Sequence, residues 1–234
     1  MKILALDTAT KYLCIGIDDG ERVFEYSVAV DRKLSALLAE AVRRTLDASG
    51  VSLDRVDYLA CGIGPGSFTA LRIGLATAKG IGWALNKKII GVSTLDILAL
   101  NAAPREGYVI PVMDAKRNLI YACVYKIKNK ILHRQSPYLL VSKEDLLAKI
   151  KRIIPVKAEN PVVFLGDAVA LYKNYFLTKV SGAELLDKDF WYPRPGNIIA
   201  CAREMIAKKN FTDVLRLEPM YLYPKECQIH KKAV

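Results

Sequence analysis

The chain opens with Lys2-Ile-Leu-Ala-Leu-Asp7, a short apolar run that ends in an acidic residue. A second apolar run, Leu13-Cys-Ile-Gly-Ile-Asp18, leads into Asp19-Gly20, a dipeptide typical of tight hairpin turns. Residues 22–30 continue as a third β-rich segment. Three consecutive strands joined by short connections predict an antiparallel meander.

Alternating helices and strands are expected after the meander. Apolar residues at helical spacing predict the next helix, which Ser49-Gly50 ends. Gly64-Pro-Gly-Ser67 is a turn that opens a long helix, and Ser93 or Thr94 caps a further one. The expected elements, in the order helix, strand, helix, strand, helix, cover residues 34–48, 58–63, 67–85, 88–92 and 93–102.

The same order then repeats after a predicted boundary at Asn101-Ala-Ala-Pro-Arg-Glu-Gly107. Tyr108–Asp114 is a strand that ends in an acid, as the first strand does at Asp7. We therefore predict an α/β protein with a duplicated actin-like, ribonuclease H-like fold, built from two β-β-β-α-β-α domains at residues 1–103 and 104–234. The later elements are expected to be strands at 119–127, 131–138 and 162–165 and helices at 142–153, 168–176 and 197–209.

Composition and charge narrow the class of protein. The 234 residues are 52% hydrophobic and 25% charged, which excludes disordered and collagen-like chains. Residues 1–103 hold 12 Lys+Arg and 11 Asp+Glu, whereas residues 104–234 hold 23 and 13, so the second half carries +10 of the total charge of +11. Such asymmetry indicates either contact with a polyanion or a simple aid to solubility.

Cysteine usage and hydropathy predict a cytoplasmic protein. The five cysteines form no C-x-x-C pair and follow no secretion signal, so they are expected to be reduced thiols. The longest apolar stretch, residues 59–85, carries Arg72 and Lys79 and is a poor membrane span.

Several residues occupy positions where the actin-like superfamily binds nucleotide. The first hairpin of that fold carries an acid and a glycine turn that grips phosphate; here Ala9 replaces the glycine, and Ala115 and Lys116 stand in the matching turn of the second half. These losses predict no bound cofactor beyond weak or vestigial ATP or ADP binding. The residues that could contribute to such a site are Asp7, Thr8, Thr10, Gly166 and Asp167.

Metal and nucleophile sets are missing from the sequence. The two histidines, His133 and His230, lie far apart and belong to no H-x-x-x-H or Cys/His cluster. No Ser or Cys has a plausible His/Asp set. The sequence therefore predicts no catalytic residue and no bound metal.

The helix at 67–85 is small or apolar on almost every face. Its glycines lower helix propensity, a cost that makes sense where another helix approaches closely. We predict that this helix and the one at 34–48 form a subunit interface; the alternative is that both only cover their own sheet. The predicted interface residues are Leu34, Leu37, Leu38, Leu71, Gly74, Leu75, Ala78 and Gly82.

The chain resembles the TsaB family, also called YeaZ, over nearly its whole length. The most specific matches are Ile3-Leu-Ala-Leu-Asp-Thr-Ala-Thr10 and Gly62-Ile-Gly-Pro-Gly-Ser-Phe-Thr-Ala-Leu-Arg-Ile-Gly74. Further matches, in the same order as in the family, are Lys79-Gly-Ile81, Gly91–Leu95, Met113–Arg117 with Tyr121, Gly166-Asp167, Tyr192-Pro193 and Pro219–Leu222.

The resemblance implies a scaffold or activating subunit of the bacterial machinery that places threonylcarbamoyl on the adenosine 3′ of the anticodon in tRNAs that read codons beginning with A. It implies a heterodimer with the catalytic paralogue TsaD, the ATPase TsaE as a further partner, tRNA contact through the complex, and a homodimer when the chain is alone. The family's usual His-Ser-Glu segment is replaced here by Leu34-Ser35-Ala36, which predicts a more apolar interface.

Three other functions remain open from the sequence. The first is a small ATP-dependent kinase or ATPase of the actin-like superfamily, and the second is a glycoprotease-like protein. The third is a stand-alone tRNA-binding module, motivated by the +10 half and by the aromatic and cationic tail at 220–232.

Overall fold

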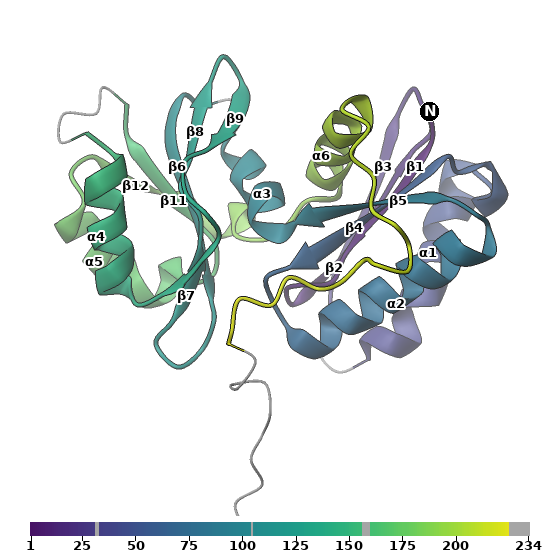
Figure 1. Ribbon diagram of the computed structural model, residues 1–234, viewed down its shortest axis with the longest axis horizontal. Coiled ribbons are helices and arrows are strands. Elements are labelled where there is room, and N and C mark those ends of the chain that lie inside the picture. The colour runs from purple at the N-terminus through teal and green to yellow at the C-terminus, as the bar shows by residue number, and fades with distance from the viewer. Residues whose placement is uncertain (31–32, 104, 156–159, 225–234) are drawn as a thin grey trace, which may run out of the picture.

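A computed structural model describes residues 1–30, 33–103, 105–155 and 160–224 of the chain, and these form two lobes that each contain one β-sheet (Figure 1). Residues 3–99 form β1 (Ile3–Asp7), β2 (Tyr12–Asp18), β3 (Val23–Ala29), α1 (Leu34–Ser49), β4 (Tyr58–Gly64), α2 (Phe68–Ala84), β5 (Lys88–Ser93) and α3 (Thr94–Ala99). The rest of the chain forms β6 (Gly107–Asp114), β7 (Ile120–Ala122), β8 (Tyr125–Lys128), β9 (Ile131–Arg134), β10 (Leu139–Val141), α4 (Lys143–Ile153), β11 (Val162–Leu165), α5 (Val169–Lys179), β12 (Ala183–Leu185) and α6 (Pro195–Ala207).

The two sheets share one topology. The first has the order β3-β2-β1-β4-β5, and the second follows the path β10-β7-β6-β11-β12. The central strand is β1 in the first sheet and β6 in the second. In both sheets the two strands on one side of it pair antiparallel, and the two on the other side pair parallel. This repeat of order and direction confirms the predicted duplicated α/β fold.

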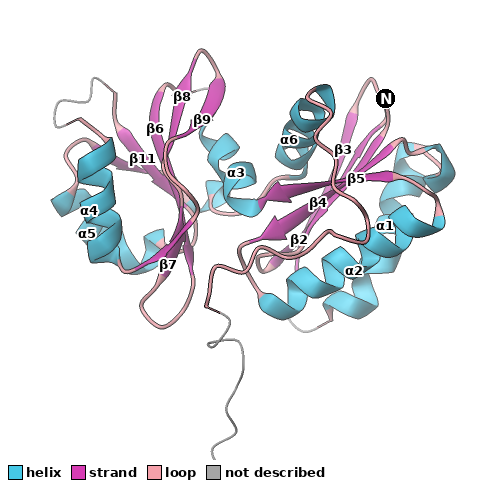
Figure 2. Ribbon diagram, viewed as in Figure 1, coloured by secondary structure: helices cyan, strands magenta, loops and turns pink. Residues whose placement is uncertain are grey.

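The central strands of each sheet are buried on both faces. In β1, Leu4 and Leu6 pack against α1 and α2, whereas Ile3 and Ala5 face α6 on the opposite side, as the alternation of strand side chains requires. In the second lobe, α4 and α5 cover one face of the sheet and α3 covers the other. The helix pairs α1–α2 and α4–α5 lie at opposite ends of the molecule, with α3 and α6 between the two sheets (Figure 2).

The strands predicted at 119–127 and 131–138 are broken into shorter pieces. β6 pairs with β7 along its second half and with β8 along its first half, so the neighbouring strand is interrupted at Cys123-Val124. There the Val124 N–H donates to the Ser136 hydroxyl at 3.0 Å instead of to a backbone carbonyl of a neighbouring strand. β8 then continues into a hairpin with β9 beyond the repeated five-strand path.

The end of the chain packs back on the first lobe. α6 lies on the first sheet, where the absence of a side chain at Gly16 lets Ile199 approach closely; a Cβ there would lie 2.8 Å from the Ile199 Cδ1. Residues 211–224 then run along β5 and α2 toward the second lobe: Thr212 bridges Ile89, and the Met220 N–H donates to the Ile63 carbonyl. The predicted division at 103/104 stays a prediction, and Cys227 and His230 lie outside the described residues.

None of the helices within the described ranges combines the length and apolar character needed to cross a membrane.

Candidate functional site

Two hairpin turns from different lobes face one cleft. The turn after β1 contributes Thr8 and Thr10, and the turn after β6 contributes Asp114 and Lys116 to the lining of a cavity of about 420 Å³. Asp167, which follows β11, lines the same cavity. The structure therefore brings together Thr8, Thr10 and Asp167 of the five predicted nucleotide-site residues, whereas Asp7 and Gly166 do not line this cavity.

Asp7 fixes the first turn from beneath. Its side chain is fully buried; Oδ1 accepts the Ala9 N–H at 2.8 Å and Oδ2 accepts the Thr94 hydroxyl at 2.8 Å. Gly62 makes room for this carboxyl, since a Cβ there would lie 1.8 Å from Oδ2. Burial raises the pKa of Asp7 to about 6, against the lowering effect of both hydrogen bonds.

This raised pKa predicts a pH-dependent effect of Asp7→Asn. Below about pH 3.9, the pKa of the unfolded state, the carboxyl is neutral in both the folded and the unfolded chain and does not destabilise the fold. As the pH rises through about 6 the buried carboxyl must ionise, and the folded state loses stability. The full cost of ionisation is about 3 kcal/mol, which an amide of the same shape avoids. We expect the variant to match the natural protein near pH 4 and to be about 1–3 kcal/mol more stable at pH 8 in urea unfolding. A stability difference that does not change with pH would contradict this role.

Both hydroxyl groups of the first turn take part in internal hydrogen bonds, Thr8 as a donor and Thr10 as an acceptor. The Thr8 Oγ1 donates to the Ala70 carbonyl of α2 at 2.7 Å, and Thr8 is 1% exposed. The Thr10 Oγ1 accepts the Tyr12 N–H at 3.2 Å. Since the Ala9 N–H is bonded to Asp7 and the Thr8 hydroxyl to Ala70, two of the donors that could bind a phosphate here already have partners.

The second turn is held in a backbone conformation that favours glycine although it contains none. Lys116, Arg117 and Asn118 have φ values of 65°, 53° and 59°. The Asp167 Oδ1 accepts the Asp114 N–H at 2.8 Å, and the Lys116 ammonium lies 2.5 Å from the Asp114 carboxylate. Burial raises the pKa of Asp167. Here too the polar groups stabilise the turn, and weak ATP or ADP binding stays a prediction.

Gly166 has a structural reason to be glycine. Its φ is 109°, and a Cβ at this position would lie 2.2 Å from the Val112 carbonyl oxygen of β6. The predicted Gly166-Asp167 pair therefore connects β11 to α5 close to the central strand of the second sheet.

The α2 residues predicted to form a subunit interface point into the core of the chain itself, and the interface stays a prediction. Leu71, Gly74, Leu75, Ala78 and Gly82 are all buried against the chain's own sheet. On α1, Leu38 is buried in the same core, and Leu34 and Leu37 pack partly against it. The physical reason is close packing within the lobe: a Cβ at Gly74 would lie 2.3 Å from the Thr8 Oγ1.

The opposite face of α2 is exposed and still largely small or apolar. Ala76, Gly80 and Trp83 lie on it; Trp83 is 75% exposed, and a Cβ at Gly80 would have no atom within 4 Å. A groove of about 430 Å³ runs beside this face between α1 and α2, and is lined by residues such as Ala39 and Ile81. We call Ala76, Gly80 and Trp83 the outer face of α2. The sequence indicates two apolar faces on this helix, and the residues predicted as the interface lie on the inward one.

A polar cluster between the lobes was also missed. Asp96 of α3 accepts hydrogen bonds from the hydroxyls of Tyr125 in β8 and Tyr138 before β10. Burial raises the pKa of Asp96. The sequence does mark this residue, because Asp96 lies in an otherwise apolar helix and is the sole acidic residue between Asp57 and Glu106. The cluster ties the second lobe to α3.

Within the described parts of the chain, no group of three or more His, Cys, Asp or Glu side chains is placed to hold a metal ion.

Comparison with known proteins points to one family. Residues 28–224 match the family model described as "TsaD: tRNA N6-adenosine threonylcarbamoyltransferase". The tRNA threonylcarbamoyladenosine biosynthesis protein TsaB of Bacillus subtilis is 30% identical over 230 residues, which cover 97% of this chain and 96% of the relative. The TsaB protein of Escherichia coli is 29% identical over 225 residues, covering 95% and 94%.

Solved structures agree on the fold. One described as YeaZ from Pseudomonas aeruginosa gives a TM-score of 0.80 at 23% identity and covers 94% of this chain and 99% of that chain. Another, described as an uncharacterized protein with similarity to peptidase YEAZ from the same organism, gives a TM-score of 0.82 at 23% identity, covering 95% and 99%.

Proposed function

Since the chain belongs to the TsaB family of tRNA threonylcarbamoyladenosine biosynthesis proteins, we propose that it is a non-catalytic scaffold or activating subunit of a tRNA-modifying complex. It acts in the cytoplasm by dimerising with TsaD, the paralogue that transfers threonylcarbamoyl to the adenosine 3′ of the anticodon. TsaE joins the pair, tRNA is contacted through the complex, and the chain forms a homodimer when alone.

The observation that carries this proposal is the exposed outer face of α2 beside the α1–α2 groove. Helices with small residues at their contact approach to the close end of the usual 8–10 Å interaxial range, so this surface suits a partner helix pair. An exposed tryptophan, Trp83, borders it, and tryptophan is among the residues enriched at the energetic centres of interfaces.

The cleft supports a non-catalytic role in a second way. Asp7, Thr8 and Asp167 each hold a turn in place through internal hydrogen bonds. These side chains are therefore occupied in building the lobe and its turns.

Co-purification tests the proposal directly. We expect a tagged chain to recover TsaD from its own cells, and we expect depletion of the chain to lower threonylcarbamoyladenosine in digested tRNA at least tenfold, measured by mass spectrometry. Re-expression of the natural chain is the control. Recovery without TsaD, together with unchanged modified nucleoside, would refute the proposal.

A further inference from the structure

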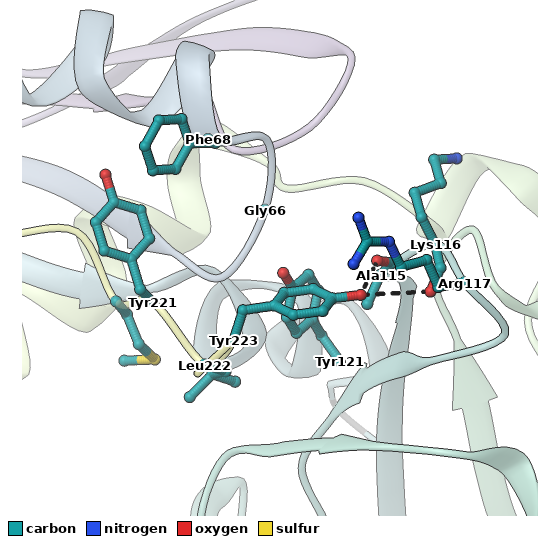
Figure 3. Close-up of a pocket in the computed structure, with 10 residues that line it drawn as sticks. Gly66, Phe68, Ala115, Lys116, Arg117, Tyr121, Tyr221, Leu222 and Tyr223 are labelled. Carbon is teal, nitrogen blue, oxygen red and sulfur yellow. Dashed lines mark hydrogen bonds between the residues drawn. The ribbon is translucent and has the colours of Figure 1, made fainter. Parts of the chain in front are cut away.

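A second cavity lies beside the cleft, where three distant segments meet (Figure 3). It measures about 330 Å³ and is lined by the start of α2, the turn after β6, and the chain segment at 220–223. We call it the aromatic pocket, and it comprises Gly66, Phe68, Ala115, Lys116, Arg117, Tyr121, Met220, Tyr221, Leu222 and Tyr223. Its volume is at the lower end of the range for small-ligand sites and matches a single compact group.

Rings from both lobes wall this pocket, and protein contacts hold them. Phe68 and Tyr221 stack with ring centroids 5.1 Å apart, and the Arg72 guanidinium lies 3.9 Å from the Phe68 centroid. Tyr121 and Tyr223 meet edge to face at 6.2 Å. Rings fixed in this way offer a planar ligand a preorganised surface.

One of these rings is anchored across the two lobes. The Tyr223 hydroxyl donates to the Ala115 carbonyl of the second turn at 2.7 Å, as Figure 3 shows. Arg72 fixes the other pair by donating from Nε to the Tyr221 oxygen at 2.9 Å.

The rim of the aromatic pocket is cationic. Lys116 is paired with Asp114, but among the described residues no carboxylate forms an ion pair with the exposed Arg117. The lining holds no acidic residue, and residues 115–143 contain seven Lys+Arg and no Asp or Glu. An anionic ligand group is therefore favoured at the rim.

We infer that the aromatic pocket binds one unpaired nucleotide of RNA, with the base against the aromatic walls and a phosphate at Arg117. Base stacking on aromatic side chains combined with cationic contacts to the backbone is the usual chemistry of single-stranded RNA recognition. An acidic peptide would satisfy the rim but leave the ring walls without a planar partner. The inference rests on the proposed function in that RNA is the substrate of the complex.

Fluorescence anisotropy of a labelled five-nucleotide single-stranded RNA tests the inference on the full chain. We expect Phe68→Leu to weaken binding at least fivefold at every salt concentration, because stacking is lost without a change of charge. We expect Arg117→Asn to weaken binding and to lower the slope of log affinity against log salt by about 0.7, the value of one phosphate contact on a single strand. Phe68 is 42% exposed and Arg117 is in an exposed turn, so both variants are expected to fold, which circular dichroism checks.

The matched control is Lys130→Asn. Lys130 is also an exposed cation in a turn with positive φ, 63° against 53° for Arg117, but it lies in the β8–β9 hairpin outside the pocket. This variant is expected to bind as the natural protein does. Equal loss in Lys130→Asn and Arg117→Asn would show general attraction to charge and overturn the inference.

A fluorescent base reports the pocket itself. With 2-aminopurine in the RNA, we expect quenching on binding to the natural protein and to Lys130→Asn, and little quenching with Phe68→Leu. RNA that binds without quenching, or a polyglutamate peptide of equal charge that binds as tightly, would overturn the inference in favour of an acidic protein partner. These readouts need neither TsaD nor modification activity, so failure here is distinct from failure of the proposed function.

Discussion

Gly74→Ala is expected to destabilise the protein by about 1–2 kcal/mol, although it adds only one methyl group to a helix. The new Cβ would lie 2.3 Å from the Thr8 Oγ1 and 3.1 Å from its Cγ2. Thr8 is buried and its hydroxyl is bonded to the Ala70 carbonyl, so it has no free space to enter. Overpacking of this kind costs about 1–3 kcal/mol and must also outweigh the gain of about 1 kcal/mol in helix propensity from Gly to Ala.

Gly80→Ala in the same helix is the matched control for this prediction. A Cβ at Gly80 meets no atom within 4 Å, so the substitution keeps only the propensity gain and is expected to stabilise the protein by about 0.5–1 kcal/mol. Urea unfolding of both variants measures the difference. Two glycines with the same effect would show that Gly74 does not serve close packing against the first hairpin turn.

The sequence predicts most of the fold because its local signals agree with the tertiary structure. Asp19-Gly20 ends β2, Gly50 ends α1 in a left-handed conformation with φ of 67°, and the Ser93 hydroxyl caps α3 by accepting the Leu95 N–H. The duplicated order of elements then determines a sheet with a shared topology in each lobe. When local preferences agree with the tertiary fold in this way, the fold can be predicted from the sequence.

The broken strands between β7 and β10 could not be predicted in the same way. Residues 119–125 are continuously apolar or aromatic, and nothing local marks the interruption at Cys123-Val124. The break depends on which part of β6 each piece pairs with and on the Ser136 hydroxyl, 12 residues away. Likewise, no local pattern of α6 reveals that it packs on the first sheet.

The sequence singles out residues that the structure brings together, but it does not indicate what their side chains bond to. Thr8, Thr10 and Asp167 were singled out, and they do line one cavity. Their hydrogen-bond partners, such as the Ala70 carbonyl for Thr8, come from other elements and appear in no motif. The aromatic pocket depends even more on assembly, since Phe68, Tyr121 and Tyr221 are brought together by the return of the chain across both lobes.

The same limit applies to the choice of face on α2. Small residues occur on both faces of the helix, and spacing alone cannot tell which face meets the sheet. The structure shows which face meets the sheet. Thr8 packs so closely on Gly74 that a side chain there would clash, whereas Gly80 faces open space. A charge at Gly74 or Ala78 would therefore test folding, and a test of association has to use the outer face.

Ala76→Glu is accordingly expected to weaken association with TsaD at least 100-fold while the monomer stays folded. Ala76 is exposed, so a carboxylate there is hydrated in the free chain, but at a close helix contact it would be buried without a partner. Burial of an unpaired charge costs several kcal/mol, and 100-fold corresponds to about 2.7 kcal/mol. Isothermal calorimetry with purified TsaD measures the affinity, and circular dichroism checks the fold.

Ala170→Glu separates the interface from a general effect of charge. Ala170 is likewise an exposed helical alanine, but it lies on α5 of the other lobe, so this variant is expected to bind TsaD normally. Trp83→Ala adds an uncharged test, because Trp83 is exposed and tryptophan is enriched among the interface residues whose truncation costs about 2 kcal/mol or more. If Ala76→Glu and Trp83→Ala both bind as tightly as the natural chain, the partner surface is not the outer face of α2. If Ala170→Glu binds as poorly as Ala76→Glu, added charge rather than position governs association.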